Sequence, residues 1–366
     1  MSPTPRAPTG RKRYPVPPAA GKITSEVFDR VVSSHLGARR RDVLLGPAMG
    51  VDVGAVRLGP GAVGLFTTDP IYVEPALGWE RACWVAFHIL ANDITTSGHP
   101  PTHILVDLNL PLDLPEHRLA TFMRVWHEEA FRLGAAILGG HTGRYPGARL
   151  PIVGGATFFA RVPARSFAAT PFIRPGLSLV MSKAAGIEAA VLLAHLLPRG
   201  PHPGRAGWGS RAARGRWREL STVTEALLAA SLGLGRSGVR AMHDAAEGGV
   251  LRALQEMVDA SGVGLSVDLS RLPIDPHAAQ VCALYGLDPL SVSSGGALFV
   301  ALPPGRVRQL LTRWKAAGIP GTVVGRFQAG PAVLEDRGQR LPPPPPDRWY
   351  VPLTLRRRTT RHHPGR

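Results

Sequence analysis

The sequence contains only two cysteines in 366 residues, Cys83 and Cys282. Two cysteines exclude a framework of several disulfides and a cysteine-rich zinc site. No apolar run approaches the roughly 18 residues that a membrane helix needs, and the basic N-terminus lacks the apolar segment of a secretory signal. These absences predict a soluble protein of the reducing cytoplasm that does not enter a membrane.

Acidic residues are also scarce, with 26 Asp and Glu against 43 Lys and Arg, which gives a formal net charge of +17. Most of the excess lies in three stretches rich in proline or glycine: 1–22, 199–218 and 331–366. We interpret 1–22 as a disordered tail, 198–218 as a loop and 331–366 as a second tail. A nucleic-acid partner is therefore not expected, although a polyanion-binding role of these segments stays open.

The chain between the two tails is long enough for two domains. Strand and helix patterns interleave in both halves, which predicts an α+β or α/β protein with domains at 23–168 and 169–330. Helices are predicted over 78–97 and 113–133, and Asp113 is expected to cap the second of them.

Three short turns in the first domain carry an acid or a histidine: Thr67–Pro70, Ala91–Ile94 and Gly139–Gly143. Asp69 follows a predicted buried strand, which Pro70 is expected to end. Asp93 continues the apolar face of the helix before it. A carboxylate on that face needs a partner, a cation or a proton. The three turns are therefore candidates for one binding site.

Two further acids lie beside glycines. Asp52 follows Gly46 and Gly50 in a loop, and Asp244 lies in the acid-rich segment 242–249. Any one of these acids also fits an ordinary turn or helix cap. Together, four carboxylates would repel one another unless a cation such as Mg²⁺ held them, and Mg²⁺ commonly bridges carboxylates to phosphates. The pattern predicts the metal and phosphate end of a nucleotide site.

In this order, the motifs resemble those of the AIR synthase-related superfamily. The matching segments are Gly46-Pro47 with Gly50-x-Asp52, Thr68-Asp69-Pro70, Ala91-Asn92-Asp93-Ile94 with Ser97-Gly98, Gly139-Gly140-His141-Thr142, Met242-His243-Asp244 with Glu247-Gly248-Gly249, and Ser293-Ser294-Gly295-Gly296. The superfamily includes aminoimidazole ribonucleotide synthetase, selenophosphate synthetase, thiamine-monophosphate kinase and the hydrogenase maturation factor HypE. The resemblance spans roughly residues 21–330 and is strongest to HypE-type proteins.

The resemblance implies a PurM-like N-terminal α+β domain, whose sheet pairs across a homodimer, and a PurM-like C-terminal α/β domain beside it. It also implies ATP and Mg²⁺ as cofactors, with ATP held near the dimer interface. The chemistry of the superfamily is activation of an amide oxygen or phosphorylation of an acceptor, which would be a small molecule or a protein.

Carried over by motif, the resemblance implies a role for each site residue. The Mg²⁺ ligands would be Asp52, Asp69, Asp93 and Asp244. Asp93 and His141 would take part in catalysis. The remaining contacts to the nucleotide would come from Gly46, Gly50, Thr68, Asn92, Gly139, Gly140 and Thr142.

The sequence departs from the superfamily pattern in four places. His141 stands where an acid is usual, Val53 replaces the second acid after Asp52, and Ala246 replaces a common Thr. HypE also carries a C-terminal cysteine that bears the carbamoyl group, whereas this sequence ends in Thr359–Arg366. We therefore do not expect the nitrile-forming mechanism of HypE, and we expect both cysteines to be core thiols.

The leading hypothesis is an ATP- and Mg²⁺-dependent, HypE-like enzyme with an unidentified acceptor. One alternative is phosphoribosylformylglycinamidine cyclo-ligase (AIR synthase) activity, which the missing acid at His141 disfavours. The other is a non-catalytic nucleotide-binding dimer that acts as a sensor or scaffold, which the same residue and the lone Asp52 favour. The sequence names no acceptor.

Overall fold

The computed structural model describes residues 21–197 and 207–349. The first half of the chain forms a six-stranded sheet in the order β1-β2-β3-β6-β4-β5. Its strands are β1 (Val43–Leu45), β2 (Gly54–Gly59), β3 (Ala62–Tyr72), β4 (His103–Leu110), β5 (Ala136–Arg144) and β6 (Ile152–Pro163). Only β4 and β5 pair in parallel, and the other neighbours are antiparallel.

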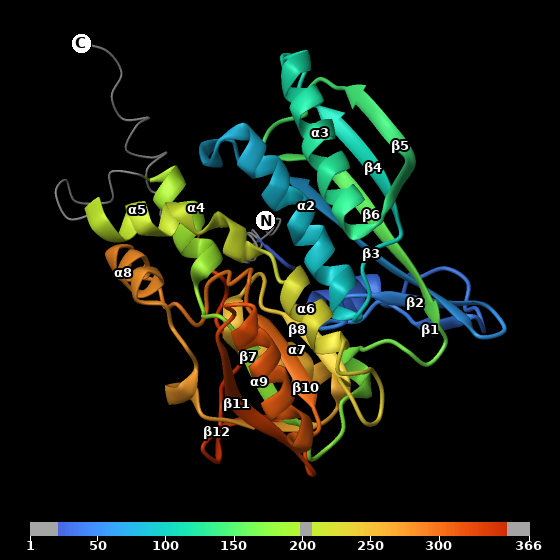
Figure 1. Cartoon of the computed structure of the whole chain (residues 1–366), viewed down its shortest axis with the longest axis vertical. Helices are drawn as coiled ribbons and strands as arrows, with labels where there is room; N and C mark the ends of the chain where they lie inside the picture. The colour runs from blue at the N-terminus through green and yellow to red at the C-terminus, as the bar shows by residue number, and fades with distance from the viewer. Residues whose placement is uncertain (1–20, 198–206, 350–366) are drawn as a thin grey trace, which may run out of the picture.

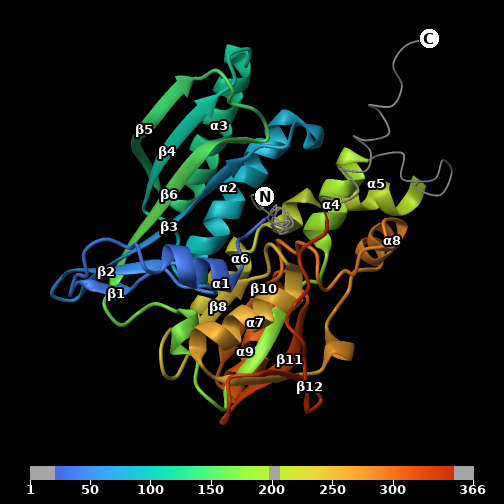
Figure 2. The ribbon, with the colours of Figure 1, turned by 180° about the vertical axis from the view of Figure 1, so that it is seen from behind.

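Two long helices, α2 (Trp79–Thr96) and α3 (Glu116–Leu133), cover one face of this sheet (Figure 1). Phe87 of α2 meets Trp126 of α3 edge to face, with ring centroids 5.4 Å apart. The alternation of β4 follows from this arrangement, because Val106 faces the helices and is buried while Leu105 is 48% exposed. Figure 2 shows the other face of the sheet, which α2 and α3 leave uncovered.

The second half forms a seven-stranded sheet in the order β13-β12-β9-β11-β7-β10-β8. Its strands are β7 (Ser178–Ser182), β8 (Ala241–Asp244), β9 (Gly264–Val267), β10 (Leu298–Leu302), β11 (Gly321–Gln328), β12 (Leu334–Asp336) and β13 (Gln339–Arg340). The helices of this half are α4 (Ile187–Leu196), α5 (Gly207–Gly215), α6 (Val223–Ala230), α7 (Gly249–Ser261), α8 (Pro276–Leu284) and α9 (Val307–Ala316). A short turn of helix, α1 (Ser25–Val27), precedes the first sheet.

Helices lie on both faces of the second sheet. Leu179 and Met181 of β7 join the core that α7 completes, whereas Val180 joins the core that α6 and α9 complete. The two halves also share a core, because Val191 of α4 and Leu220 pack with the residues beneath the first sheet. The predicted two-domain α+β and α/β organisation is confirmed. Within the described residues, no helix is both long enough and apolar enough to span a membrane.

Two of the predicted turns are strands. β3 continues through Pro70 to Tyr72, and Pro70 is accommodated because it lies opposite Gly155 next to an irregularity in the pairing. β5 runs through the segment predicted to turn at Gly139–Gly143, because parallel pairing to β4 keeps it extended.

Other boundaries also differ from the prediction. The N-cap of α3 is Pro115, without a side-chain hydrogen bond, rather than Asp113. Helix α5 lies within the predicted loop, of which 198–206 falls outside the described residues.

The C-terminal segment differs most from its prediction as a tail. β12 and β13 add to the second sheet because the edge of β9 pairs with β12, which in turn pairs with β13. Further on, the buried Asp347 accepts hydrogen bonds from the Gly248 N–H at 2.8 Å and the Ser293 hydroxyl at 2.7 Å. Residues 331–349 therefore belong to the second domain. Of the predicted tails at 1–22 and 331–366, residues 1–20 and 350–366 lie outside the described residues.

Candidate functional site

Helix α2 carries Asp93 to the junction of the two domains. Its last turns place Ala91 and Ile94 in the core, while Asp93 keeps part of its surface exposed on the side of β3. There the Thr67 hydroxyl donates a hydrogen bond of 3.4 Å to Oδ2 of Asp93. Burial raises the pKa of Asp93 well above its ordinary value, and the neighbouring Asp69, Asp244 and Asp52 raise it further. The structure therefore brings the four predicted carboxylates together.

The second domain contributes to this group from β8. Nδ1 of His243 lies 2.9 Å from Asp52, and Nε2 lies 3.1 Å from Glu256 of α7. Burial alone would lower the pKa of His243, but these two carboxylates raise it to about 10. The imidazole is therefore a cation near neutral pH. It ties the loop that carries Asp52 to the second domain.

The group keeps an excess of acid despite this cation. Burial and the charge of Asp52 raise the pKa of Asp244 to about 7, although His243 and Lys22 act in the opposite direction. The backbone N–H of Lys22 donates to Glu247 at 2.6 Å. The pKa of the Lys22 ammonium is raised by Glu256, Asp244 and Asp52 against the opposing effect of burial. We refer to Asp52, Asp69, Asp93 and Asp244 as the acid cluster.

Asp52 and Asp244 of the acid cluster bring carboxylate oxygens close enough to share a divalent cation. Ligand atoms of Asp52, His243 and Asp244 all lie within 4.8 Å of one another. Both ring nitrogens of His243 already have carboxylate partners, so the imidazole orients Asp52 rather than offering a ligand. Carboxylate oxygens are the ligands that Mg²⁺ prefers, and a cation among them would relieve the repulsion that raises the pKa of Asp93.

Asn92 lies next to Asp93 but points elsewhere. Its buried amide donates to the Leu220 carbonyl at 2.9 Å and accepts from the Thr222 N–H at 2.7 Å. Thr68 donates to the Ala156 carbonyl at 3.1 Å on the neighbouring strand β6. These contacts give Asn92 the role of fastening α2 to the second domain, and they place the Thr68 side chain on β6.

The predicted glycines have packing roles of their own. A Cβ at Gly50 would lie 2.4 Å from the Glu256 carbonyl, and a Cβ at Gly140 would lie 1.8 Å from the Val106 carbonyl. Both glycines also have positive φ. Close backbone packing therefore requires glycine at these two positions whether or not a phosphate binds. A Cβ at Gly46 or Gly139 would meet no such obstacle.

His141 lies apart from the acid cluster within one chain. Asp69, Ala156, Val106 and Gly140 form one row across the sheet, with Gly140 next to His141. Three strand spacings separate the two ends of the row by about 14 Å. The exposed His141 ring instead contacts the Tyr145 hydroxyl at 2.5 Å, and Thr142 is exposed beside it.

Three residues of this group carry no predicted role from the sequence: Lys22, His243 and Glu256. The sequence does offer one sign that His243 belongs to the site, namely its position next to Asp244 within segment 242–249. Glu256 is one of several charged residues of α7, and Lys22 ends a predicted tail. No local pattern distinguishes these two. The cysteines are buried as expected, and burial raises the pKa of Cys83 and of Cys282 to about 12.

Two family models match the chain and together cover most of it. The AIR synthase related protein N-terminal domain matches residues 50–163, and the AIR synthase related protein C-terminal domain matches residues 174–335. The first range covers the first sheet except β1, and the second covers most of the second sheet and its helices. The chain therefore belongs to the AIR synthase related family, with the two PurM-like domains that the sequence predicts.

Known members of the family are similar over most of their length. Carbamoyl dehydratase HypE of Rhodobacter capsulatus is 27% identical over 295 residues, which is 76% of this chain and 78% of that protein. Among solved structures, AaThiL complexed with AMPPCP and TMP superposes with a TM-score of 0.65 at 19% identity, covering 89% of this chain and 98% of that chain. Hydrogenase maturation protein HypE in complex with ATP superposes with a TM-score of 0.58 at 18% identity. The superposition covers 89% of this chain and 97% of that chain.

Proposed function

We propose that this protein is an ATP- and Mg²⁺-dependent, HypE-like enzyme of the cytoplasm that activates or phosphorylates an acceptor. The observation that carries the proposal is the acid cluster, in which three neighbouring carboxylates and burial raise the pKa of Asp93. An excess of buried acid at a domain junction is costly for folding and is typical of a site that binds a cation and its anionic partner. The similarity to a HypE solved with ATP and to a ThiL solved with AMPPCP supports the nucleotide.

The residues of the acid cluster have distinct roles in this proposal. Asp52, Asp69, Asp93 and Asp244 would hold Mg²⁺, which neutralises the phosphates of ATP. His243 keeps the Asp52 carboxylate oriented through the 2.9 Å contact, and Glu256 stabilises the imidazolium from its other side. Charge-assisted contacts of this kind fix a ligand carboxylate before the nucleotide arrives.

We also propose a homodimer formed through the uncovered face of the first sheet. The large apolar side chains exposed on its strands include Leu58, Phe66, Leu105, Leu138 and Ile152. An exposed apolar surface of this kind is typical of an interface. A second copy on this face would lie over β5, where His141 and Thr142 are, so these residues would contribute to a site shared by two chains.

A non-catalytic nucleotide sensor remains the alternative, and the position of His141 favours it. The imidazole is exposed on β5 and contacts Tyr145 of the same chain. Imidazole is also a poor ligand for Mg²⁺. Under this alternative the protein binds ATP with Mg²⁺ but releases it unchanged with every acceptor, including formylglycinamidine ribonucleotide.

The decisive variant is Asp69→Asn, which keeps the shape of the side chain and removes its charge. Mg²⁺-dependent ATP turnover should fall by about 100-fold or more, because a ligand that neutralises the phosphates is lost. Asp113→Asn is the matched control, since Asp113 is exposed at the start of α3 and should retain full turnover. Full turnover in Asp69→Asn would contradict the proposed role of the acid cluster.

A further inference from the structure

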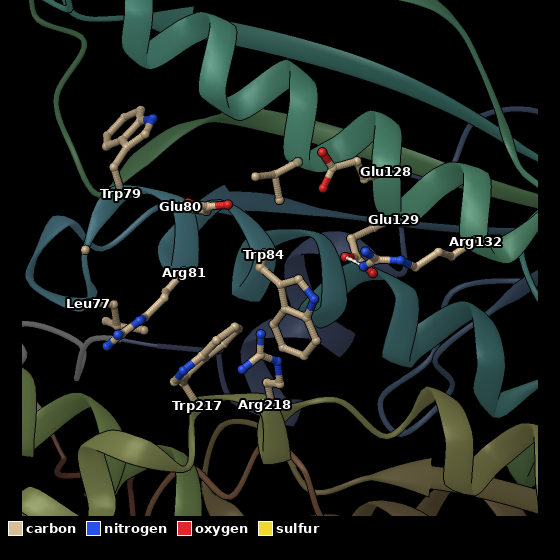
Figure 3. A pocket seen from close by; sticks show the side chains of 12 residues that line it. Leu77, Trp79, Glu80, Arg81, Trp84, Glu128, Glu129, Arg132, Trp217 and Arg218 are labelled. Atoms are coloured by element: carbon tan, nitrogen blue, oxygen red, sulfur yellow. Dashed lines mark hydrogen bonds and ion pairs between the residues drawn. The ribbon is translucent and has the colours of Figure 1, made fainter.

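A cavity lies at the opposite end of α2 from Asp93. It has a volume of about 730 Å³ and opens between the start of α2, the C-terminal half of α3 and the segment that carries Trp217 and Arg218 (Figure 3). Trp84 precedes Asp93 by nine residues on the same helix, which corresponds to about 14 Å. The cavity is therefore separate from the acid cluster, and we refer to it as the tryptophan–arginine cleft.

The aromatic walls of the cleft are held in place by their neighbours. One face of Trp84 stacks on His88, with ring centroids 3.8 Å apart, and its ring meets Trp217 edge-on at 4.9 Å. The Trp79 indole N–H donates to the Arg118 carbonyl at 2.7 Å. Trp79 and Trp84 are only half-buried, so the cleft offers aromatic surface that is already fixed in one arrangement.

The acids of the cleft already have partners. Glu129 contacts both His88 and Arg132. Glu80 and Glu128 both bind Arg124, at 2.8 and 2.9 Å. Arg132 neutralises Glu129, whereas Glu80 and Glu128 share the single positive charge of Arg124.

Two guanidinium groups of the cleft stand in contrast to these acids. Arg218 lies over the Trp217 ring at 4.1 Å from its centroid, and Arg81 lies over the same ring at 6.0 Å. Both arginines are exposed, and within the described residues neither forms an ion pair with a carboxylate. Figure 3 shows Trp84, Trp217 and Arg218 gathered in the middle of the cleft. The free charge of the cleft is therefore positive.

We propose that the tryptophan–arginine cleft binds a small planar anion, which is a ring that carries a carboxylate or a phosphate. The ring would lie against Trp84, and the anionic group would bind Arg81 and Arg218. The volume is within the range of small-molecule sites, which are lined by aromatic side chains with a few placed charges. Arginine is suited to both anions because its planar donors match carboxylate and phosphate oxygens.

The bound anion would contact both domains. Arg81 and Trp84 belong to α2, whereas Trp217 and Arg218 precede α6 in the second domain. Ser221, which follows Trp217 and Arg218 in the chain, also contacts α2. Its hydroxyl lies 2.8 Å from Nδ1 of His88. The cleft is thus a binding site for a second ligand, distinct from the nucleotide that the acid cluster is proposed to hold.

The test uses the full chain labelled with 5-fluorotryptophan and three probes of one shape: benzoate, phenyl phosphate and benzamide. The fluorine signals of Trp84 and Trp217 are assigned with Trp84→Phe and Trp217→Phe. Benzoate or phenyl phosphate at millimolar concentration should shift both signals, as expected for ligands of about ten heavy atoms. Neutral benzamide should bind about tenfold more weakly. Whichever of benzoate and phenyl phosphate binds more tightly shows whether the natural ligand carries a carboxylate or a phosphate.

Charge variants locate the binding. Arg81→Gln and Arg218→Gln should each weaken the anionic probes by about tenfold, because each removes a charge-assisted contact. Arg308→Gln, at an exposed position of α9 far from the cleft, is the matched control and should leave the titration unchanged. The proposal is overturned if benzamide binds as well as both anions, if Arg218→Gln leaves the titration unchanged, or if no shift occurs up to about 20 mM. These titrations contain no ATP, so their outcome is independent of the proposed enzyme activity.

Discussion

The two ends of helix α2 form sites of opposite charge. Near its C-terminal end, Asp93 joins three other carboxylates, and burial together with these carboxylates raises the pKa of Asp93. Near its N-terminal end, Arg81 and Arg218 lie over one tryptophan ring, while the carboxylates around them are already paired. We therefore propose a cation site at one end and an anion site at the other.

The difference between the ends lies in how each is assembled. The acid cluster takes one residue from each of four places: Asp52 from the loop before β2, Asp69 from β3, Asp93 from α2 and Asp244 from the end of β8. Each of these residues lies in a short motif of its own. The tryptophan–arginine cleft combines the start of α2 with Trp217 and Arg218, more than 130 positions away by sequence number. The middle of α2, where His88 and Asn92 bind segment 220–222, connects the two.

The largest expected effect on stability comes from breaking that connection with Asn92→Ala. The change leaves the Leu220 carbonyl and the Thr222 N–H buried without partners, which should cost about 2–4 kcal/mol in the free energy of unfolding. Urea denaturation measures this. Asn109→Ala is the control, because Asn109 bonds only to Asp107 in an exposed pair, and it should cost less than about 0.5 kcal/mol. Equal costs for the two variants would show that α2 is not fastened at Asn92.

The free energy of unfolding should depend on pH through Glu188. This residue lies in α4, close to Asp244 and two other acids. Burial raises the pKa of Glu188 from 4.5 to about 7, and the acids Asp347, Glu247 and Asp244 add to this although the Gly295 N–H opposes it. The native state then holds a proton that the unfolded chain has lost. This favours the native state at low pH, and the contribution disappears as the pH rises through about 7.

Glu188→Gln tests this sign. At pH 8 the variant should be more stable than the unchanged protein by roughly 1–3 kcal/mol, and at pH 5 the difference should nearly vanish. Thermal unfolding at the two pH values measures it. A difference that grows toward pH 5 would show that the Glu188 carboxylate is stabilised as an anion.

The smallest expected effect is Asp93→Asn without nucleotide or metal. Removing one of four repelling carboxylates should raise stability by about 1 kcal/mol, whereas Mg²⁺ and ATP together should stabilise the unchanged protein more than the variant. Melting temperatures in chelator and in Mg²⁺ with ATP provide the comparison. A variant less stable than the unchanged protein in chelator would indicate that Asp93 makes a favourable native contact and is not held under repulsion.

The acid cluster could be predicted from sequence because its residues are local signals. Asp93 interrupts an apolar helix face, and Asp69 lies on a largely buried strand pattern, so both are conspicuous in the sequence alone. The two domains follow from the alternation of strand and helix patterns. The predicted turns at Pro70 and Gly139–Gly143 were wrong, because pairing with β6 and β4 overrides the local preference of proline and glycine for turns.

The remaining features depend on contacts between distant segments. The positive charge of His243 comes from Asp52 and Glu256, which are 191 and 13 positions away. Proline-rich composition predicts that Asp347 lies in a tail, yet its carboxylate binds Gly248 and Ser293. Nor could composition distinguish Arg218, in an arginine-rich stretch, from its neighbours. Periodicity and composition report on local structure, and these contacts are not local.

The most direct test of the central claim is a calorimetric titration of the full chain with ATP, in the presence and in the absence of Mg²⁺. The acid cluster should repel the phosphates of ATP alone and bind them through Mg²⁺. We therefore predict binding at millimolar ATP or below with Mg²⁺ and a marked loss of affinity in chelator. The absence of binding at millimolar ATP with Mg²⁺, or equal binding in chelator, would contradict the assignment of Asp52, Asp69, Asp93 and Asp244 as a nucleotide-metal site.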